Sequence, residues 1–208
     1  MVLNSYRNVG DRMLTPIARP MRKINPDILS VIAFLFAFLA GFLFYLTNFM
    51  TELLLLAALF IFLNAFFDAL DGTVAKISGK ASKKGDFLDH VLDRYADVFI
   101  LGGITLSIYC NNIIGLFAVV SILLASYLGT QAQAVGVGRV YSGVLGRADR
   151  LVILIALPLI QYMLINQGII CIWKFTFVEW VMIYFAVAGQ ITVIQRFFGA
   201  WKMLKTKK

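Results

Sequence analysis

The sequence has few of the residues that bind zinc or form covalent cross-links. Among its 208 residues are two cysteines, Cys110 and Cys171, and one histidine, His90. Neither cysteine belongs to a CxxC or Cys/His pattern, which argues against a zinc site. Both fall near the outer ends of predicted helices, so a disulfide between them is one alternative. Two isolated buried thiols are the preferred interpretation. On a helix, His90 should point about 100° away from Asp89, which favours a packing or interface role.

Charged residues are also scarce. They make up 14% of the sequence, whereas hydrophobic residues make up 61% and the mean hydropathy is +0.85. Soluble domains are about 45–50% apolar, so the sequence lies outside that class. The net charge is nevertheless +8. A chain that is both basic and strongly apolar is typical of a membrane protein whose cations lie at one interface. Nucleic-acid binding is disfavoured because no soluble domain is present to carry it.

Six apolar segments are long enough to cross a bilayer core, which takes roughly 20 helical residues. They lie near residues 28–47, 53–75, 87–109, 113–134, 150–168 and 176–200. Asn25 can cap the first segment and Pro26 can occupy its first helical position. No small-residue cleavage site follows it, which indicates a span rather than a signal peptide. With no internal repeat or low-complexity linker, residues 25–208 are predicted to form one six-helix transmembrane domain.

Residues 1–24 form a predicted juxtamembrane segment. Apolar residues recur there at spacings of three and four, with arginines between them: Tyr6, Val9, Met13, Ile17 and Met21. This pattern favours an amphipathic helix on the membrane surface over an irregular arm. Pro16 and Pro20 should bend or break that helix.

The lysines and arginines gather on one side of the predicted bundle. Of the 19, all but Arg94 and Lys174 fall in the N-terminal segment, in the second-to-third and fourth-to-fifth connections, or at the C-terminal end. By the positive-inside rule both termini are cytoplasmic. We therefore expect an integral protein of the cell membrane with its site open to the cytoplasm.

The stretch from Phe66 to Asp97 holds six aspartates and no glutamate, with apolar sequence on both sides. Two of them lie near the end of the second span, and four follow at spacings of three, four and four in the third: Asp68, Asp71, Asp86, Asp89, Asp93 and Asp97. On helices, residues so spaced share one face. A charged side chain at the bilayer centre costs roughly 2.5–3.5 kcal/mol, so these carboxylates should face a polar cavity inside the bundle.

Carboxylates brought together repel one another, and a nearby cation must offset that cost. Because no histidine or cysteine is among the predicted ligands, Mg²⁺ or Mn²⁺ fits better than zinc. The alternative is a lattice of salt bridges at a helix end. It stays open mainly for Asp86 and Asp97, and Asp97 can pair with Arg94.

The pattern Asp68-x2-Asp71-Gly72-x2-Ala75-Lys76-x8-Gly85-x3-Asp89-x3-Asp93 resembles the signature of the CDP-alcohol phosphotransferase family. The family has arginine where this chain has Lys76, and the other fixed positions match. The six-span topology and the N-terminal amphipathic helix are similar too, so the resemblance covers the whole chain. It implies phospholipid headgroup synthesis, in which the phosphoryl group of a CDP-lipid passes to an alcohol and CMP leaves.

The resemblance also implies roles for individual residues. Two divalent ions, Mg²⁺ or Mn²⁺, would be held, one by Asp68, Asp71 and Asp89 and the other by or beside Asp68, Asp89 and Asp93. Asp93 would be the general base that takes the hydroxyl proton. The CDP-lipid would bind at Asp71, Gly72, Ala75, Lys76 and Gly85, where a lysine cannot make the forked contact of an arginine. The family further implies a homodimer.

Three arginines are candidates for binding a phosphate on the acceptor: Arg147, Arg150 and Arg196. Such side chains can clamp a phosphate, or they can be ordinary anchors at the membrane interface. The stretch "GRADRLVIL … VIQR" is most similar to the archaetidylinositol and phosphatidylinositol phosphate synthases. That branch has basic residues late in the fourth span, where this chain has Gln131 and Gln133 instead.

The acceptor and the lipid are therefore not fixed by the sequence. Inositol phosphate or a related polyol is the preferred acceptor, with glycerol phosphate or serine as alternatives. The lipid can be CDP-diacylglycerol or CDP-archaeol.

Two other functions are disfavoured by the positions of the acidic residues. Intramembrane prenyltransferases, which also use aspartates with Mg²⁺, have their two motifs far apart in sequence, whereas Asp71 and Asp89 are 18 positions apart. A cation transporter should have acidic or polar residues continuing toward the outer side. Of the acidic residues, only Glu52 and Glu179 lie outside the cytoplasmic half. The site is therefore predicted to open to the cytoplasm alone.

Overall fold

The structure is a computed structural model that describes residues 7–138, 140 and 142–206. These residues form seven helices: α1 (Arg7–Ala18), α2 (Pro26–Leu46), α3 (Leu53–Ser78), α4 (Lys83–Thr105), α5 (Asn112–Ala134), α6 (Arg147–Asn166) and α7 (Phe177–Thr206). The β-structure within the described ranges is one isolated bridge between Ile172 and Phe175. The predicted all-α class is confirmed.

Five of the described helices are long and apolar enough to cross a membrane, namely α2, α3, α5, α6 and α7. Their outward faces carry many exposed large apolar side chains, such as Leu35, Phe62 and Leu116, as expected for helices covered by lipid. Helix α4 has 23 residues, but its first half carries most of the acidic cluster. Its place as a sixth span therefore stays a prediction.

Helix ends in the acidic region follow from local sequence. Asn25 caps α2 by accepting a hydrogen bond from the Asp27 backbone N–H at 3.2 Å, and Pro26 opens the helix, as the sequence predicts. Helix α3 ends at Ser78 and is capped by Gly79, whose φ of 67° suits a residue without a Cβ. Ser82 then caps α4 by accepting from the Gly85 N–H at 3.1 Å. This short connection turns the chain back, so the aspartates of α3 and α4 come to the same end of the bundle.

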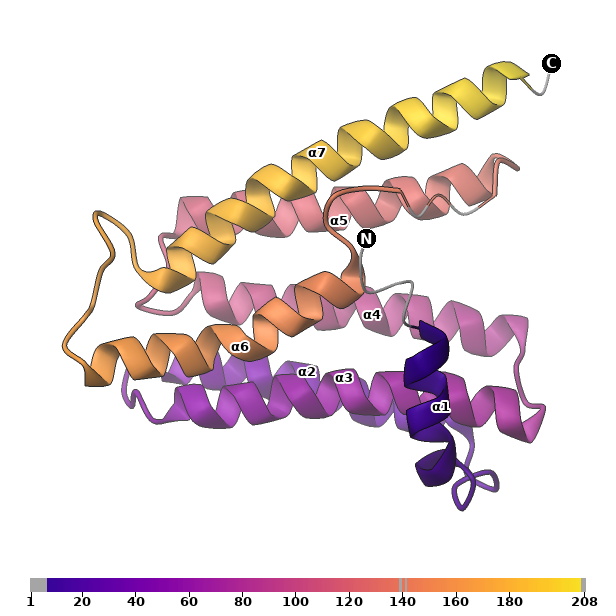
Figure 1. Ribbon diagram of the computed structural model, residues 1–208, viewed down its shortest axis with the longest axis horizontal. Helices are drawn as coiled ribbons and strands as arrows, with labels where there is room; N and C mark the ends of the chain where they lie inside the picture. The colour runs from indigo at the N-terminus through magenta and orange to yellow at the C-terminus, as the bar shows by residue number, and fades with distance from the viewer. Residues whose placement is uncertain (1–6, 139, 141, 207–208) are drawn as a thin grey trace.

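Helix α2 packs along both α3 and α4, and it is the element that holds these two helices in place. Helix α5 packs against α7, and α6 packs against α3 and α7. Figure 1 shows α1 lying across the long helices near the end where α3 and α4 are joined, and α1 packs against α3. The arrangement leaves the acidic faces of α3 and α4 directed into the bundle between these elements.

Within the described residues, helix α1 covers only part of the predicted segment 1–24. It ends at Ala18, before Pro20, and Pro16 lies in its last turn. Met13 and Ile17 are exposed, whereas Met21 packs with Leu29, Leu70 and Val74 beneath the helix. Tyr6 lies outside the described residues.

Both cysteines are free, so the structure contains no link between Cys110 and Cys171. Cys110 is buried, and its burial and the Glu179 carboxylate raise the pKa of its thiol to about 12. Cys171 is exposed, so the expectation that both thiols are buried is wrong for Cys171. It precedes a turn in which the backbone of Trp173 adopts a positive φ of 62°.

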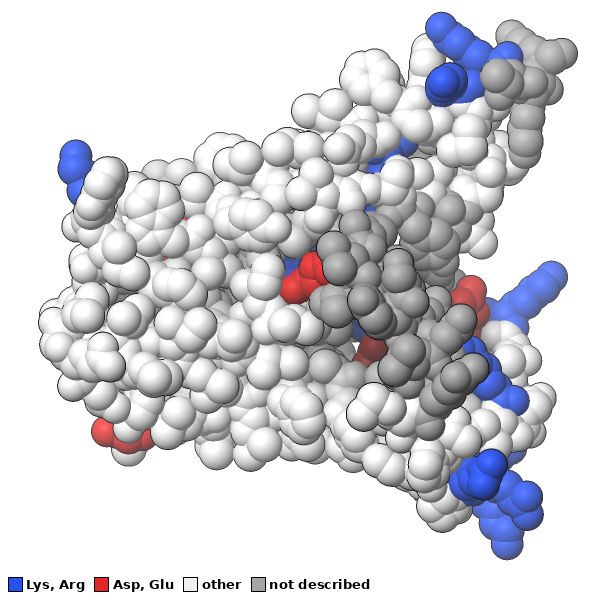
Figure 2. All heavy atoms as spheres, viewed as in Figure 1, with Lys and Arg blue, Asp and Glu red and all other residues white. Residues whose placement is uncertain are grey.

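Basic side chains are distributed unevenly over the surface. On the face shown in Figure 2, they gather at the end of the bundle where α7 ends and where α3 joins α4, with one basic patch at the opposite end. This is the same end that carries the aspartates of the acidic region.

Two glycines fix the close approach of α2 and α4. A Cβ added to Gly103 would lie 2.0 Å from the Gly41 carbonyl oxygen, a clash that only backbone movement relieves. We expect Gly103→Ala to destabilise the protein by about 1–3 kcal/mol or more, since overpacking a tight contact costs that much. The neighbouring Gly102 has no atom within 4 Å of an added Cβ, so Gly102→Ala is the matched control. Thermal unfolding in detergent measures both, and equal stability of the two variants would show that the contact is not tight.

Candidate active site

The carboxylates of α3 lie at two depths. Asp71 is buried and accepts a hydrogen bond from the Ser30 hydroxyl of α2 at 2.5 Å. Asp68, one turn earlier, accepts from Nη2 of Arg147 at 2.8 Å. The helix spacing of three residues directs both toward the same space. The α2 helix therefore contributes a hydroxyl to the acidic cluster, a contact that no motif in the sequence indicates.

The carboxylates of α4 form a graded row. Asp86 is exposed, and Asp89 has 35% of its side chain exposed. Asp93 and Asp97 are buried, with only 6% and 7% of their side chains exposed. The row therefore runs from the surface into the bundle along one helix face. Asp89 and Asp93 are the members level with the aspartates of α3.

The aspartates converge across the space between α3 and α4. One carboxylate oxygen each from Asp68, Asp71 and Asp89 lies within 4.8 Å of the others. An arrangement of three carboxylate oxygens suits a hard divalent cation such as Mg²⁺ or Mn²⁺. The residues present thus fit the metal that the sequence implies, and they are the three predicted to hold the first ion.

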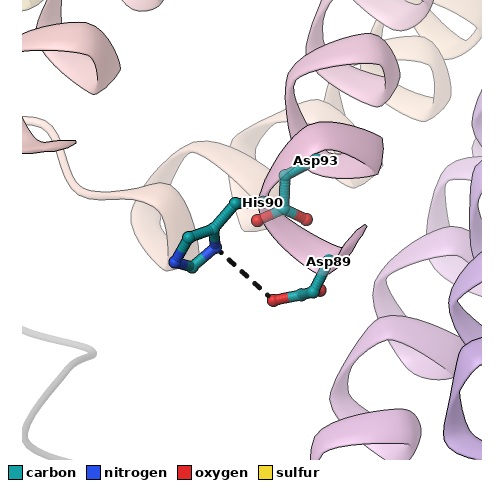
Figure 3. Close-up of side chains that lie close together, drawn as sticks. All are labelled: Asp89, His90 and Asp93. Carbon is teal, nitrogen blue, oxygen red and sulfur yellow. Dashed lines mark ion pairs between the residues drawn. The ribbon is translucent and has the colours of Figure 1, made fainter. Parts of the chain in front are cut away.

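A second group contains Asp89, His90 and Asp93, whose ligand atoms also lie within 4.8 Å of one another. Figure 3 shows the His90 ring turned toward Asp89, with Nδ1 at 3.7 Å from Oδ2, and Nε2 lies 3.5 Å from Asp86. The expectation that His90 points away from Asp89 is therefore wrong, because the ring swings back along the helix surface. The contact between His90 and Asp86 could have been predicted from their spacing of four residues, which places both on one helix face.

The carboxylates line a narrow cleft. Its walls come from α2, α3 and α4: Ser30, Ala33, Phe34, Asn64, Asp68, Asp89, Leu92, Asp93 and Ala96. The volume is ≈ 10 Å³, which is about what a single water molecule requires. Apolar groups form much of the wall, so charges inside the cleft interact more strongly than they would in water.

The three arginines predicted to bind the acceptor have different partners in the structure. Arg147, the first residue of α6, contacts both Asp68 and Asp93 through Nη2. Arg150 is 5% exposed and donates to both oxygens of Asp97, at 2.6 and 2.8 Å. Arg196 donates to the backbone carbonyls of Ser142, at 3.0 Å, and Ala125.

Asp97 belongs to an ion-pair network next to the acidic cleft. Besides Arg150, it contacts Nη1 of Arg94 at 3.3 Å, the pairing considered from the sequence. Arg94 also lies 3.7 Å from Asp93, so the network borders the acidic cleft. It joins α4 to α6 and fixes the start of α6, where Arg147 lies.

Apart from the buried Asp71, the residues predicted to bind the CDP-lipid are exposed or half-buried. Gly72 and Lys76 are exposed and Ala75 is half-buried, on the last turns of α3. A Cβ on Gly72 would meet no atom within 4 Å, whereas one on Gly85 would lie 3.4 Å from Asp27 and Ser82 side-chain oxygens. The surface beside Gly72 is therefore open. Arg139, whose role the sequence does not settle, lies outside the described residues.

Comparison with known proteins bears directly on this arrangement. A profile of CDP-alcohol phosphatidyltransferases matches residues 23–194. The chain belongs to the CDP-alcohol phosphatidyltransferase family. It is a membrane-embedded transferase of phospholipid biosynthesis, and its acidic cluster is of the kind that holds a divalent metal ion.

Relatives with assigned activities cover nearly the whole chain. The archaetidylinositol phosphate synthase of Methanothermobacter thermautotrophicus is 33% identical over 204 residues, covering 98% of this chain and 96% of that protein. The enzyme of the same name from Pyrococcus horikoshii is 32% identical over 182 residues, covering 88% and 86%. The predicted similarity to this branch is confirmed.

Solved structures share the fold. The phosphatidylinositol phosphate synthase of Mycobacterium tuberculosis with CDP-DAG bound has a TM-score of 0.72 and 26% identity, over 91% of this chain and 94% of that chain. The same enzyme in complex with manganese and citrate has a TM-score of 0.72 and 25% identity, over 90% and 88%.

The Arg150–Asp97 pair should stabilise the junction of α4 and α6. Removing one partner of a buried ion pair costs about 3–5 kcal/mol, whereas removing both is often close to neutral. We expect Asp97→Asn to lower the unfolding temperature strongly, and Asp97→Asn with Arg150→Met to recover much of the loss. The control is Asp86→Asn, whose side chain is 66% exposed and whose effect should stay within about 0.5 kcal/mol. A double variant no more stable than Asp97→Asn would contradict the pairing.

Proposed function

We propose that the protein transfers a lipid phosphoryl group from CDP-diacylglycerol or CDP-archaeol to an inositol phosphate or a related polyol, with release of CMP. The observation that carries this proposal is the convergence of Asp68, Asp71 and Asp89 from α3 and α4 in a chain of this family. The acceptor is supported by relatives that are named archaetidylinositol or phosphatidylinositol phosphate synthases. Glycerol phosphate and serine are the alternative acceptors.

In this proposal α4 also crosses the membrane, as the third of six spans along the chain, and α1 lies on the membrane surface. The length of α4 and the direction of its aspartates into the bundle support the first point. The exposed Met13 and Ile17 on α1 support the second, because they can enter the headgroup region. The concentration of basic side chains at one end supports cytoplasmic termini and a cytoplasmic site. Residues 25–208 would act as one domain.

Asp68, Asp71 and Asp89 would hold one divalent ion, and Asp68, Asp89 and Asp93 would hold or border a second. When bound, such ions stabilise negative charge on the phosphoryl oxygens and on the leaving phosphate. The hydrogen bond from Ser30 orients the Asp71 carboxylate, as outer partners of metal ligands commonly do. The half-apolar walls of the cleft exclude bulk water, which limits hydrolysis of the CDP-lipid.

Asp93 would accept the proton from the attacking hydroxyl of the acceptor. Its carboxylate is buried beside Asp89 at the inner end of the cleft, next to the side chains that would border the reacting phosphate. A general base so placed contributes typically about 10²–10⁴-fold to the rate. The CDP-lipid would reach this point from the surface at Gly72, Ala75, Lys76 and Gly85, with Asp71 buried beneath it.

Arg147 is the residue we favour for the phosphate of the acceptor. It contacts Asp68 and Asp93 at the border of the cleft, and 34% of its side chain is exposed, whereas Arg150 is 5% exposed. Arg150 and Arg196 stay predicted members of this pocket, and in the structure their guanidinium groups hold Asp97 and two backbone carbonyls. A homodimer, implied by the family resemblance, also stays a prediction.

The proposal is tested by product analysis. Purified protein is incubated with a CDP-lipid, Mn²⁺ and each of inositol phosphate, inositol, glycerol phosphate and serine, and the lipid product is identified by mass. We expect a product with inositol phosphate and none in excess chelator, because the carboxylates need the ion to bind the diphosphate. Full activity in chelator would contradict the metal site, and a product with serine alone would change the acceptor.

Asp93→Asn tests the base. An amide cannot take the hydroxyl proton, so we expect transfer to fall by at least about 10²-fold, while binding of the CDP-lipid stays detectable by thermal shift. Asp86→Asn, which changes an exposed member of the same row, is the control and should stay active. Turnover by Asp93→Asn close to that of the unmodified protein would remove Asp93 from this role.

A further inference from the structure

Arg147 contacts both Asp68 and Asp93, two aspartates on different helices. Nη2 donates to Oδ1 of Asp68 at 2.8 Å and also contacts Oδ1 of Asp93. We propose that Arg147 and a divalent cation exchange at this position: Arg147 neutralises the two carboxylates when no ion is bound, and it leaves them when the ion binds. The inference rests on the proposed function, in which Asp68 is a ligand of the ion.

The geometry makes joint occupancy unfavourable. Besides contacting Oδ1 of Asp93, Arg147 occupies Oδ1 of Asp68, one of the two oxygens through which that carboxylate can bind a metal ion. An Mg–O bond is about 2.0–2.1 Å long. An ion on that oxygen would therefore lie within about 5 Å of Nη2, where two positive charges in a half-apolar cleft repel strongly. One of the two cations has to move.

Of the two cations, Arg147 is the one whose side chain we expect to move when the ion binds. It is the first residue of α6, a helix end that favours negative rather than positive charge. It keeps 34% of its side chain exposed, whereas Arg150, one turn further on, is 5% exposed and held by both oxygens of Asp97. The Arg150 pair can thus anchor the start of α6 while the Arg147 side chain swings toward the surface.

The exchange gives the site an order of events. With the carboxylates occupied by an ion, the Arg147 guanidinium is released at the border of the cleft, where the phosphate of the acceptor is expected. Binding of the ion and capture of the acceptor phosphate by Arg147 then favour each other, since each removes Arg147 from Asp68 and Asp93. By thermodynamic linkage this coupling acts equally in both directions.

The first test measures metal binding without catalysis. The free Mn²⁺ signal in electron paramagnetic resonance gives the affinity of metal-stripped, purified protein in the absence of substrates. We expect Arg147→Met to bind Mn²⁺ about tenfold or more tightly than the unmodified protein, because the competing charged hydrogen bonds are gone. Arg147→Lys, which keeps the charge, should stay much closer to the unmodified protein.

Arg22→Met is the control for the loss of one positive charge, because Arg22 is exposed and outside the acidic cleft. Its Mn²⁺ affinity should change by less than about twofold, since exposed charges are screened. Equal affinity of Arg147→Met and the unmodified protein would overturn the exchange and leave the metal site standing. Absence of Mn²⁺ binding to the unmodified protein would overturn the metal site of the proposed function itself.

The second test asks whether the guanidinium actually leaves. Phenylglyoxal modifies accessible arginines, and the modified peptides are quantified by mass spectrometry in unmodified protein with chelator or with Mn²⁺. We expect the rate at Arg147 to rise severalfold with Mn²⁺ while the rate at Arg22 stays constant, because Arg147 loses its carboxylate partners. An unchanged or slower rate at Arg147 would mean that the arginine stays in place, and the exchange would be wrong.

Discussion

The site depends on the neutralisation of carboxylates gathered in a half-apolar cleft. Asp68, Asp71, Asp89 and Asp93 lie close together between α3 and α4, and like charges in such surroundings repel far more than in water. Cations are therefore a condition of the fold as well as of the chemistry. The described residues meet that condition with guanidinium groups from α4 and α6, and the same oxygen atoms suit a divalent ion.

The packing of the other helices fixes the spacing between the acidic faces of α3 and α4. Helix α2 packs along both α3 and α4, with its glycine contact to α4, so that these two helices meet through their carboxylates rather than through close packing. Ser30 of α2 then orients Asp71, and the Arg150–Asp97 pair fixes the start of α6. Each of these elements acts on the position of an aspartate or of Arg147.

The acidic site could be predicted from sequence because its information is local. Spacings of three and four residues place aspartates on one helix face, and the cost of charge in a bilayer directs that face inward. The contacts of Ser30 and Arg147 could not be predicted, because they depend on how α2 and α6 pack against α3. The same holds for Cys171, which is exposed in the connection between α6 and α7, and for the separate partners of Arg150 and Arg196.

The central claim is that aspartates of α3 and α4 share a divalent ion. The most direct measurement is an anomalous difference map from crystals of the protein grown with Mn²⁺. We predict a peak coordinated by carboxylate oxygens of Asp68, Asp71 and Asp89 together, with Arg147 turned away from it. A peak bound to one helix alone, or bound elsewhere while these three carboxylates point apart, would contradict the account.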